Sequence, residues 1–454
     1  MDALAPHRDV SRRAHVALKV SMLEGALHAV MVGVAESYFG AFAVELGHGP
    51  RRLALLSTLP LLSGACVQLS SPLLCAWLGS RKRLALAGAL GQTASLGALI
   101  AIAVLQSSSF PALLAAQVGF WVSGGAMAPA WNAWMANLTL HTHRPRYFAR
   151  RSALNHLALL IAFGAAGYAL HHAGVEVLNC FVALFAVGFM ARLSSVVALA
   201  FQVDVEASRR VRVWEAMIMP RLRSALVQGR FGVTAYLGAL AFGTHLAAPF
   251  FTPYMLRELS LDYRSYAALS ALSILAKALT FPCCHHIAEK LGLWALLRWA
   301  GAGVALTPLV WALSSDFGAL VFAHLLGGAV WAAVEYASYQ LLLDGAPGDL
   351  TAEFFSISNG VTGLAQVAGA LTGGLLLGQH AMSYGQIFLL SSLLRALPLA
   401  FLIFAPHVEH FPVPWRVLYA RLLRSSGRGA GPMLAATELP RTLGNRTTEP
   451  PPAL

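Results

Sequence analysis

Long apolar runs, separated by short polar and basic segments, occupy most of the sequence between residues 20 and 405. Each run has about 20 residues, which is enough for an α-helix to cross about 30 Å of hydrocarbon. The runs lie near 20–44, 53–78, 84–105, 110–137, 153–171, 176–201, 231–256, 264–284, 293–314, 317–343, 354–378 and 385–405. They predict an all-α polytopic membrane protein with twelve transmembrane helices.

Composition supports this prediction, because 57% of the 454 residues are hydrophobic and only 11% are charged. The mean hydropathy of +0.64 lies well outside the usual range for a soluble domain. The net charge of +12 does not indicate a nucleic-acid partner, since the basic residues lie mostly between the apolar runs. There they are expected to face the anionic surface of a lipid bilayer.

The five cysteines lie within or at the ends of apolar runs, so we interpret them as packing residues rather than a disulfide framework. The consecutive CCHH at 283–286 resembles a metal-binding sequence. Adjacent helical residues point about 100° apart, however, and cannot converge on one ion. We therefore predict no metal site and no cofactor. The first apolar run is long enough to span and lacks a small-residue cleavage site, so no cleavable signal peptide is expected.

Basic residues are distributed unevenly between alternate loops. With both termini in the cytoplasm, the outside segments hold only Arg51, Arg52, Arg257 and Arg264. Arg192, Lys277 and Arg395 fall within apolar runs, and the rest of the 32 basic residues lie on the cytoplasmic side. This asymmetry predicts cytoplasmic termini. We expect a monomer in the cell (inner) membrane.

An internal repeat relates the two halves of the chain. At a spacing of 213 residues, Glu45-Leu46 recurs as Glu258-Leu259 and Gly79 as Gly292. At a spacing of 203 residues, Asn132 corresponds to Glu335 and Arg192 to Arg395. The change of spacing implies an insertion or deletion between the third and fourth helices of the halves.

The repeat and the composition together predict five regions. They are a cytoplasmic N-terminal segment (1–19), a first six-helix half (20–201), a basic cytoplasmic linker (202–230), a second six-helix half (231–406) and a cytoplasmic tail (407–454). The tail is rich in Arg, Gly and Pro, a composition typical of disorder.

Two six-helix halves in parallel repeat resemble the major facilitator superfamily of transporters. WLGSRKR at 77–83 is similar to the family's cytoplasmic gating motif at its basic end, through Gly79, Arg81 and Lys82. The second copy, HHIAEKLGLW, retains Glu289, Lys290 and Gly292. PAWNAWM at 129–135 also resembles bacterial members without an assigned substrate. The resemblance covers about residues 20–406. It implies two halves that alternate access around a cavity lined by helices 1, 4, 7 and 10.

The tenth predicted helix carries polar residues on one stripe. His324, Gly328, Trp331 and Glu335 fall within about 60° of one another at 100° per residue. The ends of the stripe are about 16 Å apart, so that His324 and Glu335 can line one wall without pairing. Alternatively, His324 bonds to a neighbouring backbone group and Glu335 pairs with an arginine. An ionised carboxylate in a span is expensive and is a functional candidate by default.

The first predicted helix offers Glu24, His28 and Glu36. Glu24 is near the cytoplasmic end, where solvation or an ion pair is expected. Glu36 lies deeper, toward the outer half, and is the better candidate for a carboxyl group that takes up and releases a proton. A fixed structural hydrogen bond is the alternative for Glu36.

Further candidates lie on other helices. Trp131 and Asn132 on the fourth helix would suit a partly apolar ligand, although packing is the alternative. His245 on the seventh helix is either a cavity histidine or one with a structural hydrogen bond. Lys277 either reaches the cytoplasmic face or pairs with a carboxylate such as Glu335. We interpret Arg192 and Arg395 as one structural role present twice.

These observations favour a secondary transporter of a small molecule, which alternates access and is coupled to protons through Glu36 or Glu335. No phosphate-binding loop of the GxxxxGK[ST] type occurs, so ATP-driven transport by this chain is not expected. An integral membrane enzyme acting on a lipid-like substrate, or a non-transporting sensor or scaffold, are the alternatives. We predict that the chain is not an enzyme, and the sequence does not identify the substrate.

Overall fold

The computed structural model describes residues 5–139, 144–202, 231–261, 263–346, 351–378 and 381–404. Within these ranges the regular structure is helical and contains no strand, which confirms the predicted all-α fold. Almost all of the predicted linker at 202–230, and the whole predicted tail at 407–454, lie outside the described residues.

The described residues of the first half form nine elements. They are α1 (Ala5–Val34), η1 (Glu36–Tyr38), α2 (Phe39–Glu45), α3 (Pro50–Leu78), α4 (Arg81–Val104), α5 (Phe110–Leu138), α6 (Arg144–His172), η2 (Gly174–Glu176) and α7 (Val177–Phe201). The helix α1 begins at Ala5, well before the predicted span at 20–44, so that part of the predicted N-terminal segment is helical.

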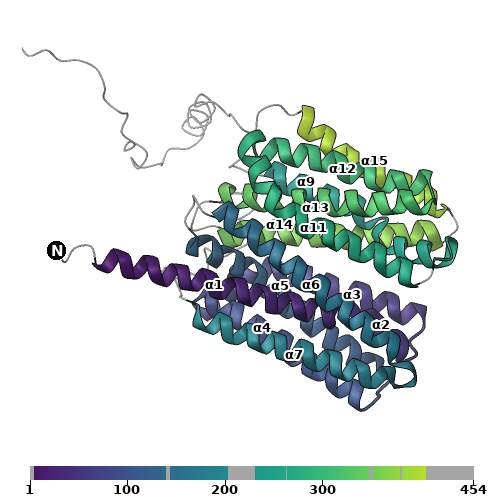
Figure 1. Ribbon diagram of the computed structural model, residues 1–454, viewed down its shortest axis with the longest axis horizontal. Helices are drawn as coiled ribbons and strands as arrows, with labels where there is room; N and C mark the ends of the chain where they lie inside the picture. Colours follow the sequence, from purple (N-terminus) through teal and green to yellow (C-terminus); the bar gives the residue numbers. More distant parts are fainter. Residues whose placement is uncertain are drawn as a thin grey trace, which may run out of the picture. The chain divides into compact units, whose positions relative to one another are not determined.

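The second half also contains nine described elements. They are α9 (Phe231–His245), η4 (Ala248–Phe250), α10 (Phe251–Pro253), η5 (Tyr254–Glu258), α11 (Tyr263–Leu291), α12 (Leu293–Leu313), α13 (Phe317–Gly345), α14 (Thr351–Gly378) and α15 (Tyr384–Phe404). Figure 1 shows the first half, purple to teal, beside the second half, green to yellow, with their helices running in roughly the same direction.

Eleven of the described segments are long and apolar enough to cross a membrane. The twelfth predicted run, 385–405, forms α15, whose described apolar part Tyr384–Ala400 is shorter. The predicted span at 231–256 is interrupted, because Pro249 and Pro253 each lack the N–H that a continuous helix needs. The chain there passes from α9 through short 3₁₀, α and π turns before α11.

Local sequence signals account for several helix ends. The Ser80 side chain accepts a hydrogen bond from the backbone N–H of Arg83 at the start of α4 (3.3 Å). Asp316 accepts from Gly318 N–H at 2.9 Å and so begins α13. Such caps satisfy backbone donors that the first helical turn leaves free. Gly79 and Gly292 follow α3 and α11 with φ of +69° and +84°, backbone conformations that favour glycine.

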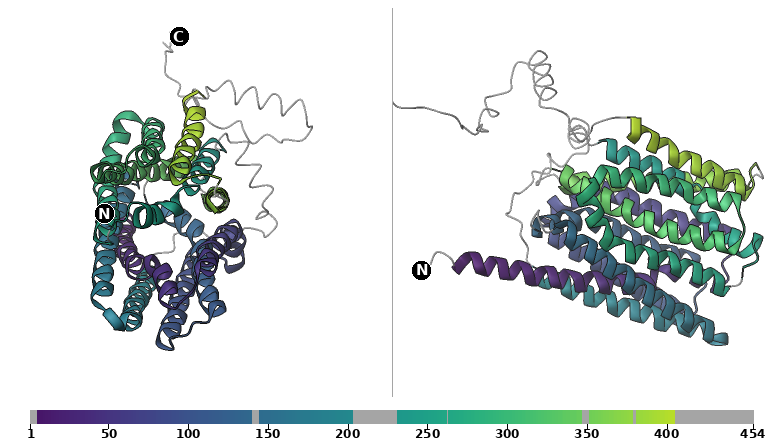
Figure 2. Two further views of the ribbon diagram at one scale, coloured as in Figure 1. Left: turned by 90° about the vertical axis from the view of Figure 1, so that its right-hand side faces the viewer. Right: turned by 45° about the horizontal axis from the view of Figure 1, so that its top comes forward.

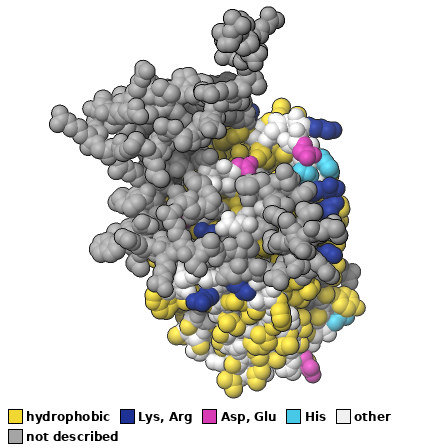
Figure 3. Space-filling view, turned by 90° about the vertical axis from the view of Figure 1, so that its left-hand side faces the viewer, with side chains coloured by type: hydrophobic (Ala, Val, Ile, Leu, Met, Phe, Trp, Pro, Cys, Tyr) yellow, Lys and Arg dark blue, Asp and Glu magenta, His cyan; other side chains and the backbone are white. Residues whose placement is uncertain are grey.

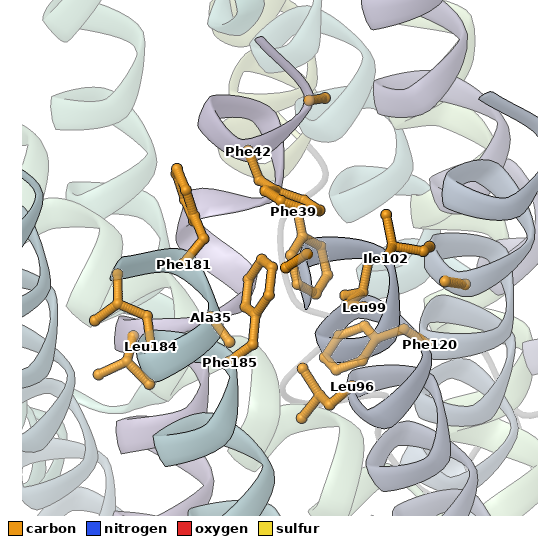
Figure 4. Close-up of a cluster of buried hydrophobic side chains, with 14 of the residues drawn as sticks. Ala35, Phe39, Phe42, Leu96, Leu99, Ile102, Phe120, Phe181, Leu184 and Phe185 are labelled. Atoms are coloured by element: carbon orange, nitrogen blue, oxygen red, sulfur yellow. The ribbon is translucent and has the colours of Figure 1, made fainter. Parts of the chain in front are cut away.

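Aromatic rings fill the core of the first half at the end opposite the start of α1. Phe42 packs edge-on against Phe185 with ring centroids 5.0 Å apart, and Phe39 packs against Phe120 at 5.2 Å. Figure 4 shows these rings converging with Phe181 and with Leu96 and Leu99 of α4. Edge-to-face pairs add to the stabilisation that burial of the rings provides.

The core clusters differ between the two ends of the molecule. At the end opposite the start of α1, one cluster draws its buried residues only from the first half, and another only from the second half. At the end where α1 starts, one cluster combines both halves, with Phe148 and Leu199 beside Leu342 and Phe354. The halves are therefore packed together at the α1-start end, while each has a separate core at the other.

Small residues allow the two halves to approach where α14 meets α3. A side chain at Gly363 would come within 2.6 Å of the Ala65 Cβ, and Gly360 lies against Leu69. Ser356 donates a hydrogen bond to the carbonyl of Gln68 at 2.5 Å. Seen along the helix axes in Figure 2, left, the two sets of helices stand side by side. Close contact of small residues is a common basis of helix packing in membranes.

Candidate functional site

A cavity of about 520 Å³ lies between the helices of the first half and α14. Its polar and charged lining residues are Glu24, His28, Glu36, Gln68, Gln92, Asn132, Arg151, Arg192, Asn359, Thr362 and Gln366. Its aromatic lining residues are Phe120, Trp121 and Trp131. This volume lies within the range of small-molecule sites.

Two arginines flank one buried carboxylate at the edge of this cavity. Arg151 of α6 donates from Nη2 to Glu24 Oε2 at 2.8 Å, and Arg192 Nη1 of α7 lies 4.0 Å from Glu24 Oε1. Glu24 is 3% exposed and Arg192 is fully buried. Of the two expectations for Glu24, solvation or an ion pair, the structure contains the ion pair. It is formed with the two arginines in the protein interior rather than in solvent. Charge-assisted hydrogen bonds of this kind offset part of the cost of burying the ions.

Arg192 also fixes the orientation of an amide. Its Nη2 donates to Gln92 Oε1 at 2.6 Å, and its Nη1 donates to Ser195 Oγ at 3.0 Å. Because the carbonyl oxygen of Gln92 accepts from Arg192, the NH₂ group lies on the other side, next to Gly124. We refer to Glu24, Gln92, Arg151 and Arg192 as the Arg192 cluster.

Arg151 and Trp131 separate this cavity from a second one of about 200 Å³, and they line both. The guanidinium carbon of Arg151 lies 4.3 Å from the centroid of the Trp131 ring, a cation–π contact. The second cavity is also lined by His156, Phe281, Glu335 and Tyr339. The same guanidinium therefore contacts Glu24 on one side and borders the chamber of Glu335 on the other.

Lys277 of α11 forms an ion pair with Glu335 of α13. Of the two alternatives for Lys277, pairing with a carboxylate is the one that the structure contains. The side chains remain 22% and 43% exposed, so the pair is only partly buried, and Glu335 borders the second cavity. The cost of placing Glu335 in a span is thus offset by a cation from α11, which packs against α13.

The structure divides the predicted cavity residues into three groups. Glu36, His28, Trp131 and Asn132 line the larger cavity, and Glu335 lines the second. His245, Lys277, His324 and Trp331 line neither of these two cavities. Both histidines of the last group lie near backbone carbonyls one turn earlier, with His245 Nδ1 3.1 Å from Ala241 O and His324 Nδ1 2.9 Å from Leu320 O.

The predicted stripe on α13 faces neighbouring helices of the second half along most of its length. His324 packs against Trp311 of α12, with ring centroids 5.3 Å apart, and Gly328 lies against the backbone of Ser273 in α11. The expected continuous cavity wall from His324 to Glu335 is therefore not formed around the larger cavity, because α11 and α12 cover this face.

Sequence reasoning missed the contribution of α14. Asn359, Thr362 and Gln366 line the cavity and lie within about 60° of one another on the helix. Such a polar stripe on an apolar helix is itself a recognisable signal. Arg151 is among the basic residues expected on the cytoplasmic side, but it lies about two turns inside α6 and contacts Glu24 and Trp131.

Arg395 occupies a different environment from its repeat counterpart Arg192. It is 2% exposed and donates from Nη1 to Val304 O at 3.1 Å and from Nη2 to Thr244 O at 3.5 Å. These partners are backbone carbonyls, and Arg395 lines neither cavity. The expectation of one structural role present twice is therefore wrong for the contacts of these arginines.

The residues predicted for the gating motif lie at the α1-start end. Lys82 donates to the carbonyls of Ala200 and Gln202 at 2.8 and 2.6 Å and so stabilises the end of α7. In the second copy, Glu289 lies near His285 and His286, with separations of 3.4 and 3.6 Å. A gating role for Gly79, Arg81, Lys82, Glu289, Lys290 and Gly292 stays a prediction.

Comparison with known proteins gives one family and a set of related folds. The sequence matches the Major Facilitator Superfamily over residues 25–370. No protein with a curated description matches it.

Three solved structures illustrate the shared fold. The E. coli fucose:proton symporter has a TM-score of 0.69 at 10% identity, with 87% of this chain and 100% of that chain covered. A bacterial homologue of the iron transporter ferroportin, in an outward-facing state, has a TM-score of 0.67 at 13% identity, covering 85% and 98%. The human organic anion transporter has a TM-score of 0.62 at 16% identity, covering 86% and 99%.

Proposed function

Since the chain belongs to the Major Facilitator Superfamily, we propose that it is a secondary active transporter that carries a small solute by alternating access. It is a multi-pass membrane protein of a transporter family, with the fold of solved transporters. The observation that carries the proposal is the polar cavity of about 520 Å³, which is lined by the first half and by α14 of the second.

The distribution of the cores supports alternating access. The halves share a core cluster at the α1-start end and have separate clusters at the opposite end. This is the arrangement expected of a state that is closed at one end, and rocking of the halves would close the other. With cytoplasmic termini, the state would face outward.

Glu36 is our candidate for proton coupling. It lines the larger cavity, and no ion pair of Glu36 occurs among the described residues. Protonation of Glu36 would therefore break no ion pair, whereas protonation of Glu335 would disrupt its pair with Lys277. We expect a pH gradient to drive accumulation by the wild-type protein and by Glu335→Gln, but not by Glu36→Gln. Gradient-driven accumulation by Glu36→Gln would contradict this assignment.

We also propose that both termini are cytoplasmic and that the monomeric protein resides in the inner membrane. Figure 3 views the α1-start end, where dark-blue Lys and Arg side chains are distributed over the described surface. A C-terminal green fluorescent protein fusion should fluoresce in cells, since it matures in the cytoplasm; a dark but correctly inserted fusion would reverse the orientation.

Uptake into proteoliposomes tests the transport function directly. Purified protein is reconstituted, and radiolabelled sugars, amino acids, organic anions and drugs are offered from outside. Saturable uptake that requires the protein is expected for at least one class of solute. Chemical conversion of a lipid without solute movement would instead favour the membrane enzyme, and binding without movement or conversion would favour the sensor.

A further inference from the structure

The Arg192 cluster concentrates positive charge at one end of the cavity. Two guanidinium groups, those of Arg151 and Arg192, share the single carboxylate of Glu24. Glu36 borders the same cavity, but no ion pair joins it to either arginine among the described residues. Within the Arg192 cluster itself, two cations therefore face one carboxylate.

We infer that this cluster binds the oxyanion group of an organic anion whose remaining body is apolar. The inference rests on the proposed transport function and names the chemical class of its substrate. A carboxylate or another oxyanion would supply the missing negative charge, and the planar fork of a guanidinium group matches its oxygen atoms.

Hydrogen-bond donors without partners support an acceptor-rich ligand. Arg192 and Trp131 border the cavity, and their buried Nε and Nε1 atoms have no hydrogen-bond partner among the described residues. Both atoms carry a hydrogen and can only donate. The Gln92 amide adds a further donor, because its carbonyl oxygen is already occupied by Arg192. Buried donors are normally satisfied, so a small shift of either side chain toward a ligand oxygen atom or water in the cavity would be favourable.

The rest of the lining indicates the nature of the ligand body. Phe120, Trp121 and Trp131 supply aromatic surface, and Leu61, Ala65 and Met127 supply aliphatic surface. A strongly hydrated sugar or an inorganic anion would leave this surface without favourable contacts. A volume of about 520 Å³ accommodates a compact organic anion with a ring or a short chain.

Matched pairs of carboxylates and their primary amides test the inference by binding alone. The probes are indole-3-acetate with indole-3-acetamide, benzoate with benzamide, and octanoate with octanamide. Each amide retains the shape of its acid and lacks the charge. Binding to the purified protein in detergent is measured from the shift in unfolding temperature and by calorimetry.

We expect at least one carboxylate to bind at least about tenfold more tightly than its amide, since hydrogen bonds to charged groups are the strong ones. Arg192→Gln should remove this preference. Arg395→Gln is the matched control, because it removes an equally buried guanidinium group that lines neither cavity. Trp131→Phe provides a second variant, which keeps an aromatic ring beside Arg151 and removes the Nε1 donor together with part of the indole ring; it should weaken carboxylate binding about threefold or more.

Three results would overturn the inference. They are equal binding of acid and amide, a carboxylate preference that survives both Arg192→Gln and Trp131→Phe, and no binding of any of the three carboxylates. A different result would contradict the proposed transport function. Carboxylates that bind with this pattern but do not enter proteoliposomes would contradict transport, whereas saturable uptake of neutral or cationic solutes alone would contradict only the anion assignment.

Discussion

Arg192 and Arg395 occupy equivalent positions in the two halves, and their surroundings differ. Arg192 contacts Glu24, Gln92 and Ser195 beside a cavity, while Arg395 contacts the carbonyls of Val304 and Thr244. At the spacings of the repeat, Glu24, Gln92 and Arg151 correspond to Leu237, Ala305 and Phe354. One half has therefore kept a charged network where the other has an apolar core, so the duplicated fold carries a site on one side only.

Of the substitutions that test this difference between the halves, Glu24→Gln is expected to cause the largest loss of stability. It leaves Arg151 and Arg192 buried without a carboxylate, and breaking a buried pair in this way costs about 3–5 kcal/mol. Leu237→Met at the corresponding position should cost less than about 1.5 kcal/mol, because it conserves volume and charge. Denaturation in detergent measures both, and equal losses would show that the network adds nothing to stability.

Replacing each arginine with methionine should give the second-largest difference in stability between the two halves. Arg192→Met removes bonds to Gln92 and Ser195 and leaves Glu24 with one cation fewer. Arg395→Met leaves one buried acceptor, the Val304 carbonyl, whose helical donor is missing because Pro308 has no N–H. We expect both variants to lose stability and Arg192→Met to lose more, by about 1 kcal/mol, because more of its partners lose a hydrogen bond. A larger loss for Arg395→Met would mean that the apolar half depends more on its arginine.

The contact between the halves can be tested on a single helix. Gly363→Leu places a side chain against Ala65 of α3 and should cost about 1–3 kcal/mol through overpacking. Gly374→Leu is the control on α14, since the space around Gly374 is open. Unfolding temperatures should separate the variants, and the same loss at both positions would argue against close packing at Gly363.

The smallest contribution to stability is expected from the ion pair of the second half. Lys277 and Glu335 are partly exposed, and such pairs contribute about 0–1 kcal/mol. A double-mutant cycle with Lys277→Gln and Glu335→Gln should therefore give a coupling energy below about 1 kcal/mol. A coupling as large as that expected for Glu24 would remove the contrast between the halves.

Hydropathy predicted the helical segments and the repeat well, because a membrane forces each apolar run into a helix that satisfies its own backbone. The rotation of a helix about its axis was not predictable in the same way. On α13, His324 and Glu335 share a stripe. However, α12 packs against this stripe at His324 and α11 packs against it at Gly328. A helix that is apolar on all sides gives no signal for which face lines a cavity.

The Arg192 cluster shows a second limit of prediction from the sequence. Glu24 is joined to Arg151 across 127 residues and to Ser195 across 171 residues. Each residue alone is ambiguous, since Arg151 lies near a helix start and Glu24 near the expected membrane surface. Only the assembly of α1, α4, α6 and α7 makes them one network. The pairing of Lys277 with Glu335 could be predicted from the sequence, because both ions lie well inside apolar runs and each needs a partner.

The meeting of Gly360 and Gly363 with Leu69 and Ala65 has a consequence for kinetics. Opening the molecule there would uncover apolar surface to water entering from that side, and hydration of such surface raises the heat capacity. The rate of interconversion between the two facing states should then follow a curved Eyring plot rather than a straight one. The activation enthalpy of opening would accordingly rise with temperature, because the heat capacity increases as this contact between α14 and α3 is exposed.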